Sequence, residues 1–372
     1  MVRWLTGLLL LCASFLAAAC PLCLGGLRPS TAQQLVALQH SVLALPSPDG
    51  SSYRVVEVIK GERPSGGIIE GAAVQVDAAV ANGRAPLLLA RDDSWPMWIS
   101  FGAIGAEHAG WLRRLAIGKR ALEMNANEWR GRVALMLPYL ENPEPLVGEI
   151  AYGEFATAPY AALLTVKSRL AAQKIRKWLA DPKLEARQPL YILLLGIAGN
   201  GEDAAGIERR LDAAWKSREA TNLGSMIAAD LQLRGQSRMA WVDAKYLADP
   251  KRSTPEIEAA LLALSVHGNA NGVIPRERVI QSYWVFMKEH KDIAGYVAQD
   301  LAAWQYWDAV PEYAALMKSD LRQQYPSRVA IMAYLRQSPS RNVIDEIPVP
   351  QDGASQPSTN TLPASSIQLL PQ

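Results

Sequence analysis

The sequence is poor in cysteine, phenylalanine, histidine and net charge. Its 372 residues include 3 Cys, 4 Phe and 4 His against 11 Trp, and the formal net charge is +2. So few cysteines exclude a disulfide-built scaffold. The balanced charge gives no electrostatic reason to expect a nucleic-acid or anionic-membrane partner. Hydrophobic residues make up 49% and charged residues 20%, which excludes wholesale disorder.

The common catalytic signatures are missing as well. The chain has no Gly-x-Ser-x-Gly, His-Glu-x-x-His or Gly-x-Gly-x-x-Gly motif and no phosphate-binding loop ending in Gly-Lys-Ser/Thr. We therefore predict no enzymatic activity and expect no cofactor. Asp92 and Asp93 fall in a predicted turn and are interpreted as solvated. The densest basic stretch is interpreted as a solvated helix face: Lys167, Arg169, Lys174, Arg176 and Lys177.

The first residues have the pattern of an export signal. Arg3 precedes an apolar run from Leu5 to Leu16, and three alanines then end at Ala19. This pattern predicts a signal peptide over residues 1–19, removed after Ala19. The apolar run is shorter than the roughly 18 residues that span a bilayer, and no later run reaches that length. We therefore expect an exported protein of the periplasm or cell envelope.

Cleavage would leave Cys20 as the first residue of a short segment, 20–27, that also holds Cys23. Several interpretations stay open: a lipid anchor on Cys20, as in bacterial lipoproteins, a local disulfide, a redox pair or a metal-handling site. Leu24 stands where haem attachment needs His. A zinc site needs four ligands, and the histidines are scattered through the chain, at His40, His108, His267 and His290.

Residues 28–105 have the pattern of a small β domain. Short β-branched or alternating runs are separated by loops rich in Gly, Pro and Asp, and they predict strands at 41–45, 53–60, 73–77, 87–90 and 98–101. Such a series is typical of a small antiparallel sheet or a partly closed, OB-like barrel. Trp95 and Trp98 are predicted to pack in its core or mouth, with a binding platform as the alternative.

The pattern changes to a helical period over residues 106–336. The apolar positions Leu190, Leu193, Leu194 and Ile197 share one helix face, and Ile257–Leu264 and Ile293–Leu301 repeat the pattern. Short helices are predicted throughout this region. The final residues, 337–372, are rich in Pro, Ser and Gln and are predicted to be disordered, because they cannot bury enough apolar surface to offset the ordering entropy.

A short motif recurs between these helices. Leu140–Pro143, Leu179–Pro182 and Leu247–Pro250 all read Leu-x-Asn/Asp-Pro. The pattern predicts that Asn or Asp caps the following helix and that Pro lies in its first turn. The wider second spacing predicts a further, degenerate copy near Trp215–Asn222.

The second copy resembles a HEAT repeat: Asp181-Pro182 is followed by Arg187 and then by the apolar helix from Leu190 to Gly196. The resemblance implies a superhelical array of helix pairs, in which Asp181 and Arg187 contribute to an interior ladder. Gly148 stands where the first copy would place its Arg. HEAT-like arrays build extended surfaces that bind proteins.

Residues 20–336 also resemble uncharacterised exported bacterial proteins that combine an N-terminal Cys-Pro-x-Cys, a small β region and HEAT-like helices. The resemblance is carried by Leu137–Leu140, Ala151–Ala156 and Asp300–Trp304, and it implies no particular activity.

The predicted function is therefore that of an exported, non-enzymatic scaffold for a protein partner. The densest aromatic cluster, Trp304, Tyr306 and Trp307, is the candidate contact site. The alternative is a thiol redox or metal-handling protein that uses Cys20 and Cys23. A weaker resemblance is to metalloprotease inhibitors, whose mature chain begins with Cys ahead of a barrel, although their spacing is Cys-x-Cys.

Overall fold

The computed structural model describes residues 29–70, 85–319 and 323–340. The chain divides into two compact units, 1–290 and 291–372. The division lies between His290 and Lys291, inside the region predicted as one helical domain. Within the part of the chain that the structure describes, no helix is long and apolar enough to cross a membrane.

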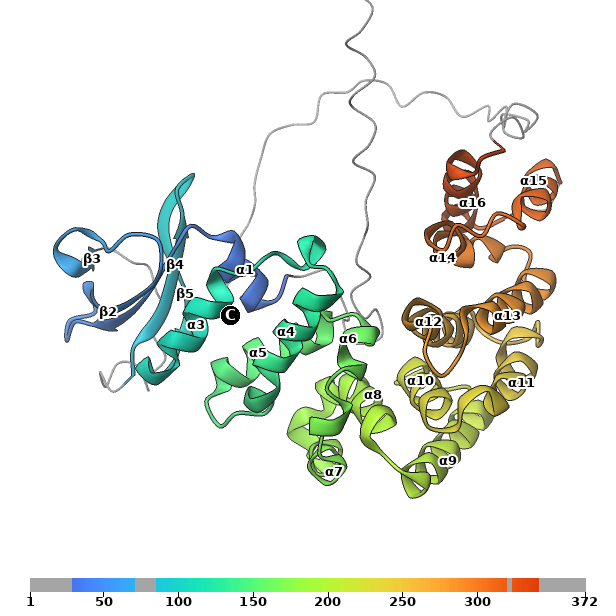
Figure 1. The fold of residues 1–372 in the computed structure, drawn as a ribbon, viewed down its shortest axis with the longest axis horizontal. Coiled ribbons are helices and arrows are strands. Elements are labelled where there is room, and N and C mark those ends of the chain that lie inside the picture. The colour runs from blue at the N-terminus through green and yellow to red at the C-terminus, as the bar shows by residue number, and fades with distance from the viewer. Residues whose placement is uncertain (1–28, 71–84, 320–322, 341–372) are drawn as a thin grey trace, which may run out of the picture. The chain divides into compact units, whose positions relative to one another are not determined.

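Unit 1 contains a five-stranded antiparallel sheet that forms a half-barrel, in the order β3-β2-β1-β4-β5 (Figure 1). The strands are β1 (His40–Pro46), β2 (Ser52–Lys60), β3 (Ile68–Glu70), β4 (Leu87–Asp92) and β5 (Trp95–Ala103). Four predicted strands are thereby confirmed, and the fifth, 73–77, lies outside the described residues. Strand β3 was not predicted.

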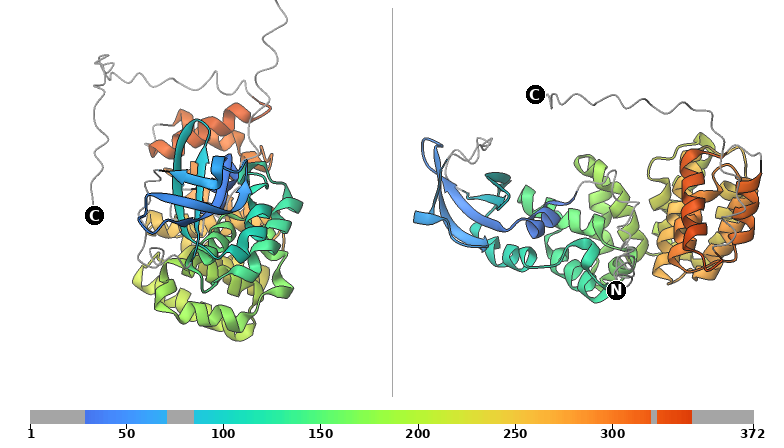
Figure 2. Two further views of the ribbon diagram at one scale, coloured as in Figure 1. Left: turned by 90° about the vertical axis from the view of Figure 1, so that its left-hand side faces the viewer. Right: turned by 90° about the horizontal axis from the view of Figure 1, so that it is seen from above.

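One face of the sheet carries its main apolar cluster, made of Val42, Ala44, Tyr53, Val55, Ile69, Leu87 and Leu89. Leu43 of β1 and Leu88 of β4 point to the other face and are also fully buried, so β1 and β4 are covered on both sides. Helix α3 (Ala109–Ala116) packs against β2. The curvature of the strands is visible in Figure 2.

A helix, α1 (Thr31–Ala37), lies in the region that was predicted to be β-rich, and it was not predicted. Ser30 caps it, because its side-chain oxygen accepts a hydrogen bond from the Gln33 N–H at 3.1 Å. Leu35 is fully buried, and α1 packs against α3 and α5 (Pro145–Thr157) rather than joining the sheet. The contacts that bury this short helix come from segments far along the chain.

From Ala106 to His290 unit 1 is helical, as predicted. Beyond α3 and α5 it contains α4 (Ala126–Met136), α6 (Tyr160–Leu164), α7 (Ala172–Ala180), α8 (Gln188–Ala198), α9 (Gly201–Ser217), α10 (Leu223–Arg234), α11 (Met239–Val242), α12 (Thr254–Ala270) and α13 (Arg276–Glu289). The periodic runs predicted from Leu190 and from Ile257 lie within α8 and α12.

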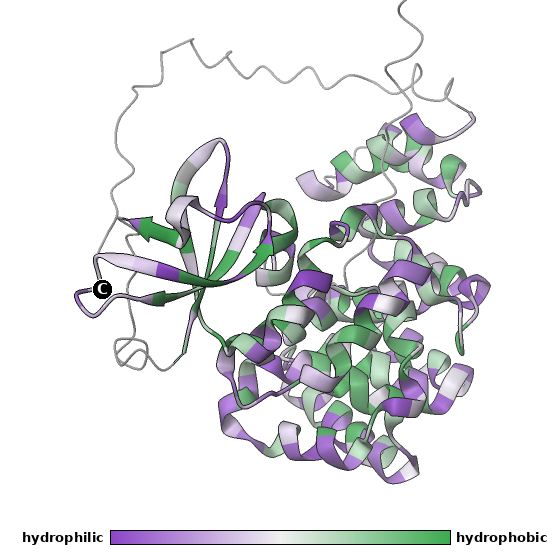
Figure 3. Cartoon of the chain, turned by 60° about the vertical axis from the view of Figure 1, so that its left-hand side comes forward, coloured by the Kyte–Doolittle hydropathy of each residue, from purple (hydrophilic) through white to green (hydrophobic). Residues whose placement is uncertain are grey.

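Helix α10 is the most enclosed helix of this set. Every residue from Leu223 to Leu231 is buried, and α10 packs against α8, α9 and α12. Gly196 permits the close approach of α8, because a Cβ there would lie 2.6 Å from the Ala229 Cα. Figure 3 shows hydrophobic residues concentrated along these inner helices and hydrophilic residues along the outer ones.

Unit 2 contains α14 (Ala298–Ala303), α15 (Val310–Lys318) and α16 (Tyr325–Gln337). The predicted helix over Ile293–Leu301 is instead a 3-10 turn, Ala294–Val297, that leads into α14. The Gly295 N–H donates to the Ser327 side-chain oxygen at 2.9 Å. This buried contact accounts for the tighter turn, because it joins the backbone at Gly295 directly to α16.

Candidate functional site

Strand β5 lies at one edge of the described sheet and carries an exposed apolar stripe, Trp95, Met97 and Ile99, which we call the β5 stripe. The three side chains are 63%, 51% and 42% exposed. They alternate along the strand, so they share one face, while Trp98 packs on the apolar cluster of the sheet. Trp98 therefore has the predicted packing role, and the same prediction is wrong for Trp95.

The turn before this stripe is acidic. Asp93 lies in the turn between β4 and β5, as predicted, whereas Asp92 is the last residue of β4. Hydrogen bonds from the Ser94 side chain and backbone hold the pKa of the Asp92 carboxyl below its usual value. Asp93 is largely exposed and lies 2.8 Å from the Nε2 atom of His40 and 3.9 Å from the Arg91 guanidinium. The β5 stripe thus has exposed apolar side chains and, at one end, two carboxylates beside one arginine.

The three Leu-x-Asn/Asp-Pro motifs share a local structure. The side-chain oxygens of Asn142, Asp181 and Asp249 each accept the backbone N–H two residues later, at 2.9, 3.0 and 3.0 Å. Each closes a short turn around Pro. The expectation that each caps the following helix, with Pro in its first turn, is confirmed for Asp181, which caps the 3-10 helix Pro182–Arg187 ahead of α8. It is wrong for Asn142 and Asp249, because α5 and α12 begin only at Pro145 and Thr254.

The predicted ladder residues have separate partners. Asp181 caps its own turn. Arg187 makes an ion pair with Glu141 of the preceding motif, with 2.7 Å between Nη1 and Oε1, and its guanidinium lies 4.7 Å from the Tyr152 ring centroid. Tyr191 also donates to Glu141. Arg187 therefore joins two successive motifs, through a glutamate that the resemblance did not indicate.

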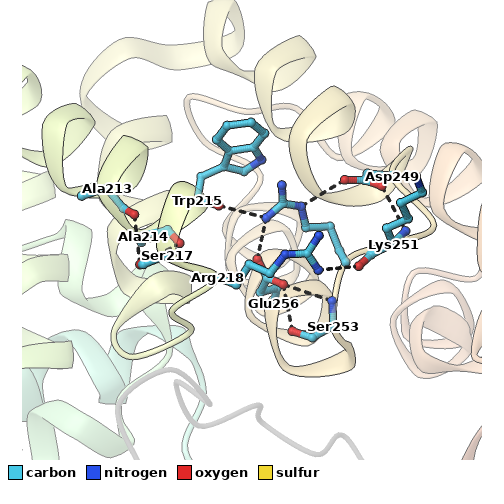
Figure 4. Close-up of polar contacts among 10 residues, drawn as sticks. Ala213, Ala214, Trp215, Ser217, Arg218, Asp249, Lys251, Ser253 and Glu256 are labelled. Atoms are coloured by element: carbon cyan, nitrogen blue, oxygen red, sulfur yellow. Dashed lines mark hydrogen bonds and ion pairs between the residues drawn. The ribbon is translucent and has the colours of Figure 1, made fainter.

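The third motif is followed by a buried arginine, Arg252, that sequence reasoning missed. Arg252 Nη1 donates to Glu256 Oε1 at 2.8 Å and to the Trp215 carbonyl at 3.1 Å, and Nε donates to Asp249 at 3.1 Å. Figure 4 labels these three partners, Trp215, Asp249 and Glu256. Lys245 Nζ lies 3.8 Å from the Trp215 ring centroid. Arg252 fastens the motif to the end of α9, and its spacing of four from Glu256 was the available signal.

The aromatic cluster predicted to bind a partner lies in unit 2. Trp304, Tyr306 and Trp307 are half-buried. The Trp307 ring packs against Tyr334 at 5.1 Å between centroids, and the Tyr334 hydroxyl donates to the Tyr306 carbonyl at 2.6 Å. Packing against α16 thus uses part of this surface.

One group of three metal-ligating side chains meets within the described ranges: Glu107, His108 and Glu144, whose ligand atoms all lie within 4.8 Å of one another. Glu144 already accepts hydrogen bonds from His108 Nε2 and from the Gly105 N–H, each at 2.8 Å. These bonds give the cluster a structural role, because they join the loop after β5 to the start of α5. His40, His267 and His290 are not part of this cluster.

Several predictions fall outside the described residues. These are the signal peptide over 1–19, the lipid, disulfide or redox roles of Cys20 and Cys23, and the tail beyond residue 340. The thiol alternative therefore stays a prediction.

Comparison with known proteins gives no match: no protein-family model, no curated protein and no solved structure is significantly similar to this chain. The mostly helical fold with a small antiparallel sheet is compatible with a helical-repeat-like architecture.

Proposed function

We propose that this protein is an exported, non-enzymatic interaction scaffold whose partner-binding surface is the edge strand β5. The observation that carries the proposal is the exposed stripe of Trp95, Met97 and Ile99 on that strand. An edge strand offers unpaired backbone N–H and C=O groups to another strand, and folded proteins usually blunt such edges with charges, Pro or bulges. Strand β5 carries Pro96, which has no N–H, and its pairing with β4 is irregular at two places, so a partner strand would pair with the part of β5 beyond Pro96. The exposed face of β5 is apolar, which favours a binding site.

The expected partner is an extended protein segment that adds to β5 as a further strand. Main-chain hydrogen bonds would supply affinity, and alternate apolar side chains would cover the β5 stripe. Asp92 and Asp93 together outnumber Arg91 at the near end, and the remaining negative charge favours a basic residue at the corresponding end of the segment. The helices would then form a HEAT-like array that supports the sheet. Export rests on the sequence of residues 1–19.

A peptide selection tests this proposal. We would select random peptides of about ten residues, near the upper length of ordinary strands, against the full chain. We expect sequences with alternating apolar residues. Met97→Lys combined with Ile99→Lys should weaken their binding about 10- to 100-fold. Only about half of each side chain is still exposed, so burying the rest contributes about half of the 1.5–3 kcal/mol that full burial gives. Fluorescence anisotropy of labelled peptides would measure the affinity.

The matched control replaces exposed apolar residues away from the sheet. Ile117 and Leu122 are 76% and 62% exposed, so Ile117→Lys combined with Leu122→Lys adds the same charge and removes similar apolar surface. The control should leave affinity unchanged. Selected peptides that bind both double variants equally well would contradict the proposal.

A further inference from the structure

Three metal-ligating side chains meet where the loop after β5 approaches the start of α5. The ligand atoms of Glu107, His108 and Glu144 all lie within 4.8 Å of one another. Glu107 and His108 are neighbours in a 3-10 turn, Ala106–His108, and Glu144 immediately precedes α5. The group therefore combines one imidazole and two carboxylates from two segments of the chain, with His108 and Glu144 36 positions apart.

Two of these three side chains are already oriented. The His108 ring makes edge contacts with the rings of Trp111 and Tyr139, at 6.1 and 5.9 Å between centroids, and only 13% of its side chain is exposed. The Glu144 carboxylate accepts the Gly105 N–H at 2.8 Å. Ligands that are held before the ion arrives lose less entropy when they bind it.

The third carboxylate lies over a glycine. Glu107 is exposed, and a Cβ on Gly105 would lie 2.4 Å from the Glu107 Oε2 atom, so a larger residue at this position would displace the carboxylate. Tetrahedral zinc binds nitrogen and oxygen ligands at about 2.0–2.2 Å, which places them about 3.4 Å from one another. A rotation of the exposed Glu107 side chain would bring its oxygen within that distance of the other two ligands.

The charge of this group is not balanced by a basic side chain. No lysine or arginine makes an ion pair with Glu107 or Glu144 within the described ranges. Another histidine–carboxylate pair, His40 with Asp93, has the same 2.8 Å separation, but Arg91 lies 3.9 Å from that carboxylate. A cation is therefore the partner that the first group lacks and the second group has.

We propose that Glu107, His108 and Glu144 bind a zinc ion, with water as the fourth ligand. Zinc would replace the proton between His108 Nε2 and Glu144 Oε1, and this proton would pass to the solvent. A set of imidazole and carboxylate ligands suits Zn²⁺, whereas Mg²⁺ and Ca²⁺ prefer oxygen ligands. The ion would strengthen the connection between the loop after β5 and α5. The site is separate from the β5 stripe, and its failure would leave the proposed partner surface untouched.

Calorimetric titration with zinc chloride tests this site. The full chain would carry Cys12→Ser, Cys20→Ser and Cys23→Ser, so that no thiol competes for the metal. We expect saturable binding of one Zn²⁺ per chain and a rise in the thermal midpoint. Magnesium chloride at the same concentrations should produce neither effect. Equal binding of the two ions, or no saturation by about millimolar Zn²⁺, would overturn the proposal.

Two variants and one control locate the ion. Glu107→Gln removes an exposed ligand, and His108→Gln removes the imidazole. Loss of a residue that only orients a metal ligand weakens binding by about 10- to 100-fold, so each variant should weaken Zn²⁺ binding by at least that much. The control, His40→Gln, breaks the pair with Asp93 and should leave the affinity unchanged. Zn²⁺ that binds Glu107→Gln as tightly as the parent chain, or that is lost equally from His40→Gln, would contradict this assignment.

Discussion

Replacing Arg132 by alanine is expected to lower the free energy of unfolding by about 3–5 kcal/mol, the usual cost of leaving one charge of a buried pair alone. Arg132 Nη1 lies 2.8 Å from Glu154 Oε2, and both side chains are almost fully buried. Ser30 donates to the other oxygen of Glu154, also at 2.8 Å. The replacement should therefore also destabilise α1, because Ser30 is its capping residue. Chemical denaturation would measure it.

An exposed ion pair provides the control. Lys119 lies 2.7 Å from Glu128 with much of its side chain in solvent, so Lys119→Ala should cost less than about 1 kcal/mol. The double replacement Arg132→Met with Glu154→Leu should recover most of the lost stability, because no uncompensated charge stays buried. Equal losses in the free energy of unfolding from Arg132→Ala and Lys119→Ala would show that burial of the Arg132–Glu154 pair does not increase the cost of breaking it.

Acidification is expected to remove about 3 kcal/mol of stability through His267 alone. Burial lowers the pKa of this imidazole from 6.5 to about 4. The unfolded chain therefore binds the proton more tightly. The contribution of His267 to the free energy of unfolding falls as the pH decreases from 6.5 towards 4, and below pH 4 this contribution is fully lost. The ring contacts the Ala228 carbonyl at 2.9 Å and the Tyr160 ring.

The contribution of His267 is measured as a difference. His267→Gln retains an N–H donor for the Ala228 carbonyl but does not titrate, so its unfolding free energy should change less over this pH window than that of the parent chain. Other groups contribute equally to both proteins and cancel. Parallel pH profiles for the two proteins would rule out the assigned role.

The sequence predicted the repeating elements better than it predicted their ends and surfaces. Strands β1, β2, β4 and β5 and helices α8 and α12 were predicted because their apolar periods are long enough to distinguish strand from helix. Helix α1 was missed because it has only 7 residues and is buried by α3 and α5. The helix after Pro182 begins late because Asp181 closes a turn of its own.

The candidate sites depend on information that periodicity does not contain. The predicted strand covered only 98–101, so the sequence did not place Trp95 and Met97 on the same strand as Ile99, and it could not show whether their shared face is covered.

Hydrogen exchange on the full chain is the most direct test of strand addition at β5. With a selected peptide bound, we expect slower exchange at β5 amides that point away from β4, because an added strand would pair with them. A peptide whose own backbone N–H groups are methylated cannot pair with β5, so it should bind weakly and leave the exchange of the β5 amides unchanged. Bound peptide that leaves exchange in Trp95–Ala103 unchanged, or that protects only helical amides, would contradict the account.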